Sequence, residues 1–175
     1  MMKPEIQNAV NAQINEELYS AYLYVAMVNY FEEINLKGAA KWMRIQVQEE
    51  LVHAHKFFEY MVARNVKVTL KAINGPKSDW KSPLAAWEAA YKHECHITEC
   101  INRLYAKASD AKDPATMQFL DWFVNEQVEE EANTSEIVAQ MKMVKDAPGG
   151  LFLLDRELAG RTAGAGAGSA EPATA

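Results

Sequence analysis

Four long segments of this chain carry apolar residues at the spacing of an α-helix, and a polar residue interrupts each apolar stripe near its middle. In the first segment, Glu17 stands between Ile14 and Ala21 on one helical face. A carboxylate on such a face points into the core of a bundle, where losing its water costs several kcal/mol unless a cation or hydrogen bonds replace that water. The interrupting residues are Glu17, Glu50 with His53, Glu94, and Gln127 with Glu130.

Prolines and capping residues predict where these helices begin. Pro4 is placed like a proline at the first helical position, and Ser82-Pro83 and Asp113-Pro114 each pair such a proline with a capping residue. The connections within the first and the second pair of helices are short, so each pair should form an antiparallel hairpin. We expect helices over about residues 4–33, 39–64, 83–109 and 114–145.

Residues 66–81 read as extended chain, because Val66, Val68 and Leu70 alternate before Asn74-Gly75-Pro76. A helix of about 28 residues is about 42 Å long, and about 16 extended residues reach about 50 Å, so this segment can cross the bundle from end to end. The predicted fold is all-α: a four-helix bundle of two hairpins joined by a long crossover, plus a short fifth helix.

The fifth helix is predicted over residues 151–158, and its first half is more apolar than a lone surface helix should be. Packing against other subunits and docking on its own bundle both account for this. We expect one domain over residues 1–159, followed by a disordered Ala- and Gly-rich tail over residues 160–175 to which we assign no function.

Composition limits the classes of partner. The 175 residues include 49% hydrophobic residues and carry a formal charge of -6, which disfavours nucleic acid and anionic membrane and suits attraction of cations. No leader-like segment precedes Lys3 and no apolar run approaches the roughly 18 residues of a membrane span, so we expect a cytoplasmic protein. Cys95 and Cys100 share one helix with the wrong spacing for a bridge, and we expect both to be reduced.

The polar residues in the four stripes lie close to the middle of each helix, so all can meet at one height in the bundle. Oxygen-rich ligands with a single imidazole suit iron or manganese better than a thiolate-type zinc or copper site. Glu50 is the natural bridge between two cations because its helix also carries His53 one turn on. A hydrogen-bonded structural acid explains any one buried Glu, but it explains the whole set poorly.

The chain resembles the prokaryotic non-haem ferritins of the ferritin-like di-iron superfamily. The resemblance is carried by residues 15–24, 48–54 and 122–131 and by the Leu-rich last helix ending at Leu158. The likeness covers about residues 3–159. It implies two iron ions per subunit. The ligands of the first iron site are matched by Glu17, Glu50 and His53. Those of the second are matched by Glu50, Glu94 and Glu130, with Gln127 beside that site. Tyr24 matches a tyrosine next to the centre; a redox role and a purely structural one are both open.

The resemblance also implies a third iron site and excludes a haem. Glu49, Glu126, Glu129 and Glu130 resemble the third site, and a solvated acidic face is the alternative. Bacterioferritins carry a haem-ligating Met directly after the bridging Glu, where this chain has Leu51, so no haem is expected. Met117 and Leu120 stand where animal ferritins place channel acids, which puts iron entry by that route in doubt.

A second metal motif is suggested by residues of the third helix, namely His93, Cys95, His96, Glu99 and Cys100. Their helical phase argues against it, because Glu94 faces the core and its neighbours point in different directions. We expect these side chains to serve in surface or interface packing.

The function implied by the resemblance is ferroxidase activity with iron storage: Fe(II) is oxidised by dioxygen, and the ferric product is stored in a hollow 24-subunit cage. A di-iron carboxylate oxidase acting on a small molecule is the alternative, and it would need a substrate pocket beside the metals. A helical assembly protein without catalysis is a third possibility, which the buried acids disfavour.

Overall fold

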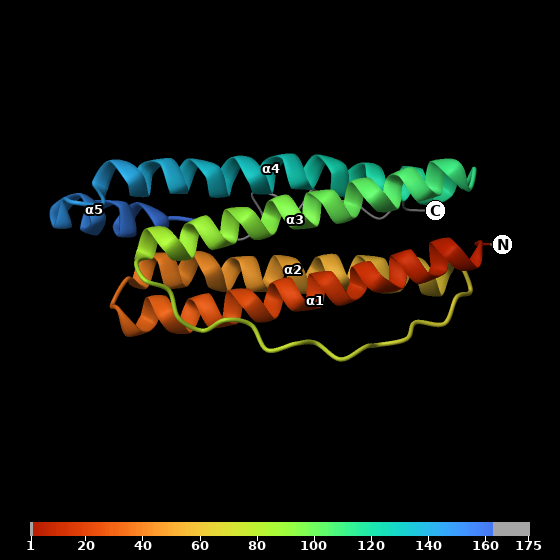
Figure 1. Ribbon diagram of the computed structural model, residues 1–175, viewed down its shortest axis with the longest axis horizontal. Coiled ribbons are helices and arrows are strands. Elements are labelled where there is room, and N and C mark those ends of the chain that lie inside the picture. The colour runs from red at the N-terminus through yellow and green to blue at the C-terminus, as the bar shows by residue number, and fades with distance from the viewer. Residues whose placement is uncertain (1, 163–175) are drawn as a thin grey trace, which may run out of the picture.

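The computed structural model describes residues 2–162, and within that range the regular secondary structure is entirely helical (Figure 1). Three of the four long helices begin at prolines, as predicted. The second helix begins at Lys37 and the fifth at Pro148, slightly earlier than the sequence indicated. The helices are α1 (Pro4–Glu33), α2 (Lys37–Ala63), α3 (Pro83–Asp110), α4 (Pro114–Val144) and α5 (Pro148–Leu158).

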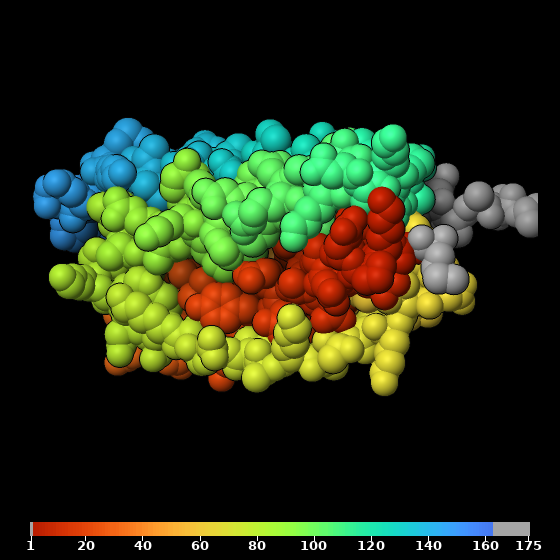
Figure 2. Space-filling model, turned by 45° about the vertical axis from the view of Figure 1, so that its right-hand side comes forward, coloured from red at the N-terminus to blue at the C-terminus, as the bar shows by residue number. Residues whose placement is uncertain are grey.

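The four long helices form the predicted two hairpins. α1 packs along α2 and α3 along α4, and the two hairpins meet chiefly where α1 contacts α3. Residues 66–81 contain no regular structure and run the length of the bundle along α1 and α2, from the end of α2 to the start of α3 (Figures 1 and 2). The long crossover and the four-helix bundle are therefore confirmed.

Three helices end in the same way, with a residue of positive φ just past the last turn. These residues are Asn35, Asn65 and Lys112, with φ of 61°, 56° and 56°. In each case the following amide closes back onto the helix, as where Leu36 N donates to Phe31 O at 2.9 Å. This bond satisfies a carbonyl that the helix end would otherwise leave without a partner. Asparagine tolerates the left-handed conformation, whereas Lys112 adopts it without that advantage.

The crossover is held to the bundle by side chains of α1. Asn11 Nδ2 donates to Thr69 O at 2.6 Å, and Thr69 N donates to Asn11 Oδ1 at 2.7 Å. Further along, the buried Trp80 ring packs edge-on against Tyr30, with centroids 5.3 Å apart. These contacts fix an otherwise extended segment at two points along its course.

The apolar core consists of two clusters separated by a polar layer. One cluster includes Tyr24, Phe31 and Trp87, and the other includes Phe57 and Phe123. On every long helix the change from one cluster to the other falls at the residues that interrupt the apolar stripes. The prediction that these polar residues share one height is therefore confirmed.

One face of α5 docks on its own bundle, which is one of the two explanations that the sequence analysis offered for the apolar residues of this helix. Leu154 and Leu158 are buried against the bundle, while Phe152 and Leu153 are exposed. Ala39 N at the start of α2 donates to Asp155 Oδ1 at 2.8 Å, so an acid of α5 caps α2, whose own N-cap residue, Leu36, makes no such bond.

Both cysteines are free, as predicted. None of the helices formed by the described residues has the length and hydropathy of a membrane span. Of the tail predicted over residues 160–175, residues 163–175 lie outside the described residues. Within the described part, Arg161 is only partly exposed and contacts α2.

Candidate metal centre

The polar layer gathers side chains from all four long helices in the middle of the bundle. Glu17 and Tyr24 come from α1, Glu50 and His53 from α2, Glu94 from α3, and Gln127 and Glu130 from α4. Each of these seven side chains is at most 3% exposed. The ring of Tyr24 lies two turns from Glu17 on α1 and packs in one of the two apolar clusters, and its hydroxyl reaches the layer at Glu94.

Three ligand atoms of Glu17, Glu50 and His53 lie within 4.8 Å of one another. His53 Nδ1 is 3.4 Å from Glu50 Oε2 and 4.0 Å from Glu17 Oε2. The other ring nitrogen, Nε2, is 3.8 Å from Glu126 Oε1. An imidazole thus lies among three carboxylates, in a space from which bulk water is excluded.

The charges in this cluster depend on one another. Burial lowers the pKa of His53, but the nearby carboxylates of Glu126 and Glu50 outweigh burial and hold that pKa well above its usual range. Burial raises the pKa of Glu50, yet the hydrogen bond to His53 and its charge leave the pKa of Glu50 below the ordinary value. Each of the two groups therefore favours the charged form of the other.

The remaining carboxyl groups are hard to ionise. Burial first, and then the negative charge of Glu50, raise the pKa of Glu17 and of Glu130 from about 4.5 to about 8. The same two causes, burial before Glu50, raise the pKa of Glu94 well above its usual range. The three carboxyl groups of Glu17, Glu94 and Glu130 consequently tend to hold protons that a divalent cation would displace.

The second half of the layer surrounds Glu94. The Tyr24 hydroxyl donates to Glu94 Oε1, and Gln127 Nε2 donates to Glu94 Oε2 at 3.2 Å. Glu130 Oε2 is buried and has no hydrogen-bond partner among residues 2–162. Glu94 and Glu130 belong to neither of the tight three-ligand groups found among the described residues, so ligand atoms are less closely grouped here than around His53.

The residues predicted for a third site are not among the close groups of ligand atoms found in residues 2–162. Glu126 is buried against His53, and Glu130 belongs to the central layer. Glu49 accepts a bond from Arg161 Nη2 at 2.6 Å, and Glu129 is exposed on α4. Glu49 therefore pairs with a cation of the protein itself.

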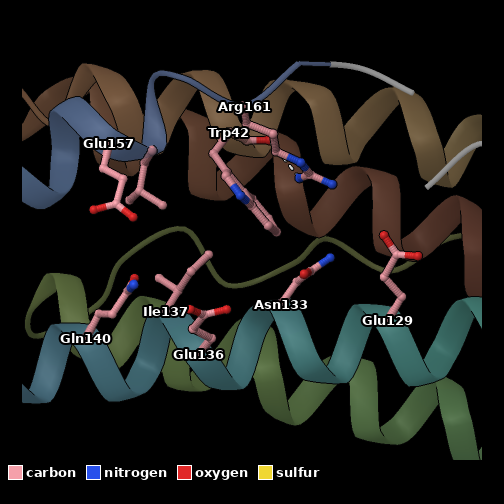
Figure 3. Close-up of a pocket in the computed structure, with 9 residues that line it drawn as sticks. Trp42, Glu129, Asn133, Glu136, Ile137, Gln140, Glu157 and Arg161 are labelled. Carbon is pink, nitrogen blue, oxygen red and sulfur yellow. Dashed lines mark hydrogen bonds between the residues drawn. The ribbon is translucent and has the colours of Figure 1, made fainter. Parts of the chain in front are cut away.

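Arg161 lies at the edge of a pocket of about 310 Å³ between α2, α4 and α5 (Figure 3). Its guanidinium stacks on Trp42 at 3.9 Å from the ring centroid, on the α2 side of the pocket. Glu129 and Glu136 rise from α4 opposite, and Glu157 comes from α5. Of the residues predicted for the metal sites, only Glu129 is among those that line this pocket.

Two glutamines that the sequence analysis did not single out hold the central carboxylates. Gln13 Nε2 donates to Glu17 Oε1 at 2.8 Å, and Gln46 Nε2 donates to Glu50 Oε1 at 3.3 Å. Both precede their carboxylate by one helical turn, and residues 13–17 and 46–50 share the pattern Gln-x-x-Glu-Glu. That repeated pattern was the signal that could have revealed them.

Gln46 also connects the centre to the C-terminal segment, since Arg161 Nη1 donates to Gln46 Oε1 at 2.8 Å. With the amide oxygen occupied in this way, the amide nitrogen is turned toward Glu50. Arg161 lay in a segment without helical periodicity, and no sequence pattern pointed to it.

Among the residues of the second motif, His93 contradicts the prediction of surface packing. It is buried, its Nε2 lies 2.8 Å from Ser20 Oγ, and burial lowers its pKa. The expectation failed because α1 and α3 pack closely, so a residue beside the inward stripe of α3 is covered by α1. Cys95, His96, Glu99 and Cys100 are partly or fully exposed.

The donor chemistry of the layer fits a transition-metal ion that prefers oxygen. Carboxylates with one imidazole are typical ligands of iron and manganese in helical bundles. The surrounding Tyr24, Phe57 and Phe123 are almost completely buried. Such packing suits small reactants better than an organic substrate.

Comparison with known proteins agrees with this architecture. The ferritin-like domain family matches residues 7–144. A bacterial non-heme ferritin of Bacteroides fragilis is 38% identical over 161 residues, 92% of this chain and 100% of the relative, and one of Campylobacter jejuni is 36% identical over 156 residues, 89% and 93% of the two chains. Among solved structures, the open pore ferritin of Archaeoglobus fulgidus superposes with a TM-score of 0.91 at 46% identity, covering 93% of this chain and 100% of that one.

Proposed function

The chain belongs to the ferritin family, and we propose that it oxidises Fe(II) with dioxygen at a di-iron centre inside each subunit and stores the ferric product in a hollow multi-subunit cage. Iron is both substrate and cargo in this proposal. The names of the relatives support an iron protein without haem.

One observation carries the proposal: acids from all four long helices and one imidazole converge in a layer that splits the apolar core. A structural role would favour neutral groups with complete hydrogen bonding, because buried charges are costly. Here Glu50 and His53 are charged, and Glu130 Oε2 has no partner among the described residues. Cations bound between the carboxylates would satisfy Glu50 and Glu130, and His53 would become a ligand on losing its proton.

The residues divide between two iron positions. Glu17, Glu50 and His53 would bind the first Fe(II), since their ligand atoms already lie together. Glu94 and Glu130, with Glu50 shared, would bind the second, and Gln127 and Tyr24 would orient Glu94. Anionic oxygen ligands favour Fe(III) over Fe(II), so the site lowers the energy of the oxidised pair. Two ferrous ions together can deliver two electrons to one dioxygen molecule.

Storage requires assembly, and the surface of the bundle supports it. Leu51, Phe58 and Val62 are exposed and lie on one face of α2, and Phe152 and Leu153 are exposed on α5. Contiguous exposed apolar residues of this kind mark contact surfaces between subunits. The number of subunits, 24, is carried over from the resemblance.

The direct test compares ferrous oxidation by two histidine variants of the same helix. His53→Ala should slow the initial oxidation measured by stopped-flow absorbance by more than about tenfold, because it removes a ligand of the first iron. His55→Ala is the matched control, since His55 is exposed on α2 and contacts Glu59 and Phe58 instead. Equal initial rates for the two variants would contradict the proposed site.

The same preparation separates the proposal from oxidation of an organic substrate. A storage protein should accumulate many ferric ions per subunit and elute from a sizing column as a large assembly. An enzyme that uses iron only as a cofactor would stop at about two ions per subunit.

A further inference from the structure

A second group of ligand atoms lies on the outside of the bundle, in the seam between α1 and α3. His96 Nε2 is 3.0 Å from Glu16 Oε2 and 3.5 Å from Cys100 Sγ, and the three ligand atoms lie within 4.8 Å of one another. Figure 2 shows this seam where the red α1 meets the green α3 on the face turned to the viewer. His96 and Cys100 are one turn apart on α3, and Glu16 approaches from α1.

The spacing of these atoms matches that of a single bound ion. With bonds of about 2.0 to 2.3 Å to nitrogen, oxygen and sulfur, the ligand atoms of a tetrahedral site lie roughly 3.3 to 3.7 Å apart. The distances from His96 to its two neighbours are within a few tenths of an ångström of that range. An ion could therefore bind with small side-chain movements and no change of the backbone.

The donor set differs from that of the central layer. One thiolate, one imidazole and one carboxylate form a mixed site of the kind that zinc and other borderline or soft divalent ions prefer. The central layer offers no sulfur, because both cysteines of the chain lie on α3 outside it. The two sites should accordingly select different ions.

The surroundings of Cys100 and Glu16 leave room for an open metal site. Burial and then the charge of Glu16 raise the pKa of the Cys100 thiol, and Arg103, whose Nη2 lies 3.0 Å from Cys100 Sγ, offsets this only in part, so a bound ion has to displace the thiol proton. A surface pocket of about 170 Å³ adjoins the group and is lined by Glu16, Cys100 and Arg103. It leaves space for a water molecule as the fourth ligand.

We propose that Glu16, His96 and Cys100 bind one divalent cation of the zinc type, with water in the fourth position. The ion bridges α1 and α3 across their seam. Cys100 loses its proton to solvent when the ion binds, and the site shares no ligand with the proposed iron centre.

Cobalt is the appropriate probe, because Co²⁺ replaces Zn²⁺ and a cobalt–thiolate bond produces a charge-transfer band in the near ultraviolet that carboxylates do not produce. Titrating the full-length, reduced, iron-free protein with Co²⁺ should produce this band with a stoichiometry of about one per chain. Added Zn²⁺ should abolish it by displacement.

Three variants assign the band. Cys100→Ser should abolish it, and Cys95→Ser is the matched control that should retain it, since Cys95 is the other thiol of the same helix. His96→Ala should weaken cobalt binding by about tenfold or more. Thermal melting of each variant without metal verifies that the bundle is folded.

Absence of the band in the parent protein overturns the proposal, as does its persistence in Cys100→Ser, its loss in Cys95→Ser, or unchanged cobalt affinity in His96→Ala. The initial rate of ferrous oxidation should be the same in Cys100→Ser and in the parent. Failure of the iron proposal would therefore be seen separately from failure of this one.

Discussion

At the scale of single residues, His53 is the cation around which the acidic layer is arranged. It lies among Glu17, Glu50 and Glu126, and these carboxylates keep it protonated despite burial. A metal ion bound at the proposed centre would have to replace the proton on His53 and those on the acids with raised pKa. Metal binding and proton release would for this reason be a single process at that centre.

This coupling predicts a pH dependence. Glu17 and Glu130 have pKa values raised to about 8 in the folded protein, so the iron-free protein binds more protons than the unfolded chain and loses stability as pH rises from about 4.5 to about 8. Iron needs the ionised carboxylates, so the stabilisation by iron should grow over the same interval. Thermal melting with and without anaerobic Fe(II) should show melting temperatures that diverge as pH increases. A difference independent of pH would contradict the assignment of these acids as ligands.

Tyr24 supplies a second prediction at this scale. Its hydroxyl donates to Glu94 in a fully buried position, so Tyr24→Phe leaves a carboxylate oxygen without that donor and should cost about 1–3 kcal/mol of unfolding free energy in the iron-free protein. Tyr22→Phe is the control, because Tyr22 is exposed on the same helix. Chemical denaturation measures both. Equal stability of the two variants would show that the Tyr24 hydroxyl has no structural role.

The sequence predicted the inward direction of the acids because helical periodicity fixes which face a residue occupies. It did not predict Gln13, Gln46 or Arg161, whose importance lies in which oxygen or nitrogen each side chain presents. Periodicity carries no information on such orientations. For the same reason, the cross-helix group of Glu16, His96 and Cys100 could not be found within the sequence of α3 alone.

At the scale of helices, the ends were predictable where a local residue determines them. Ser82 and Asp113 cap α3 and α4, since their side chains accept bonds from Ala85 N and Thr116 N as the sequence indicated. The start of α2 was less predictable, because its capping acid, Asp155, is supplied by α5 from far along the chain. A contact of this kind exists only after the chain has folded.

The closeness of α2 and α5 predicts the effect of a small substitution. A Cβ atom at Gly38 would lie 1.6 Å from Asp155 O, so Gly38→Ala must displace α5 and should cost roughly 1–3 kcal/mol. Gly149→Ala is the control within α5 itself, because nothing lies within 4 Å of a Cβ atom there. Hydrogen exchange of residues 148–158 should accelerate in the first variant alone. Unchanged protection in Gly38→Ala would mean that the close contact is not maintained in solution.

At the scale of the whole molecule, the long crossover was predictable from its length and its alternating residues, and Asn11 and Trp80 show how it is fixed to the bundle. Which apolar surfaces remain exposed was not predictable, because the helical pattern marks a face as apolar without saying what covers it. The stripe of Leu51, Phe58 and Val62 became recognisable only from the packed bundle.

This stripe predicts an effect on assembly. The parent protein should have a mass many times that of one chain in light scattering, and the double substitution Phe58→Glu with Val62→Glu should reduce it, because charges in an apolar contact are costly to bury. Val128→Glu is the control at a similarly exposed position on α4. A parent of single-chain mass would contradict the cage, and an unchanged mass of the double variant would exclude this stripe as a contact.

We propose that the layer formed by Glu17, Glu50, His53, Glu94 and Glu130 binds a pair of iron ions. Crystals soaked anaerobically with Fe(II) and measured on both sides of the iron absorption edge would locate these ions. We expect two anomalous peaks per subunit, one on each side of Glu50. Iron peaks confined to the protein surface, with none between the four long helices, would contradict it.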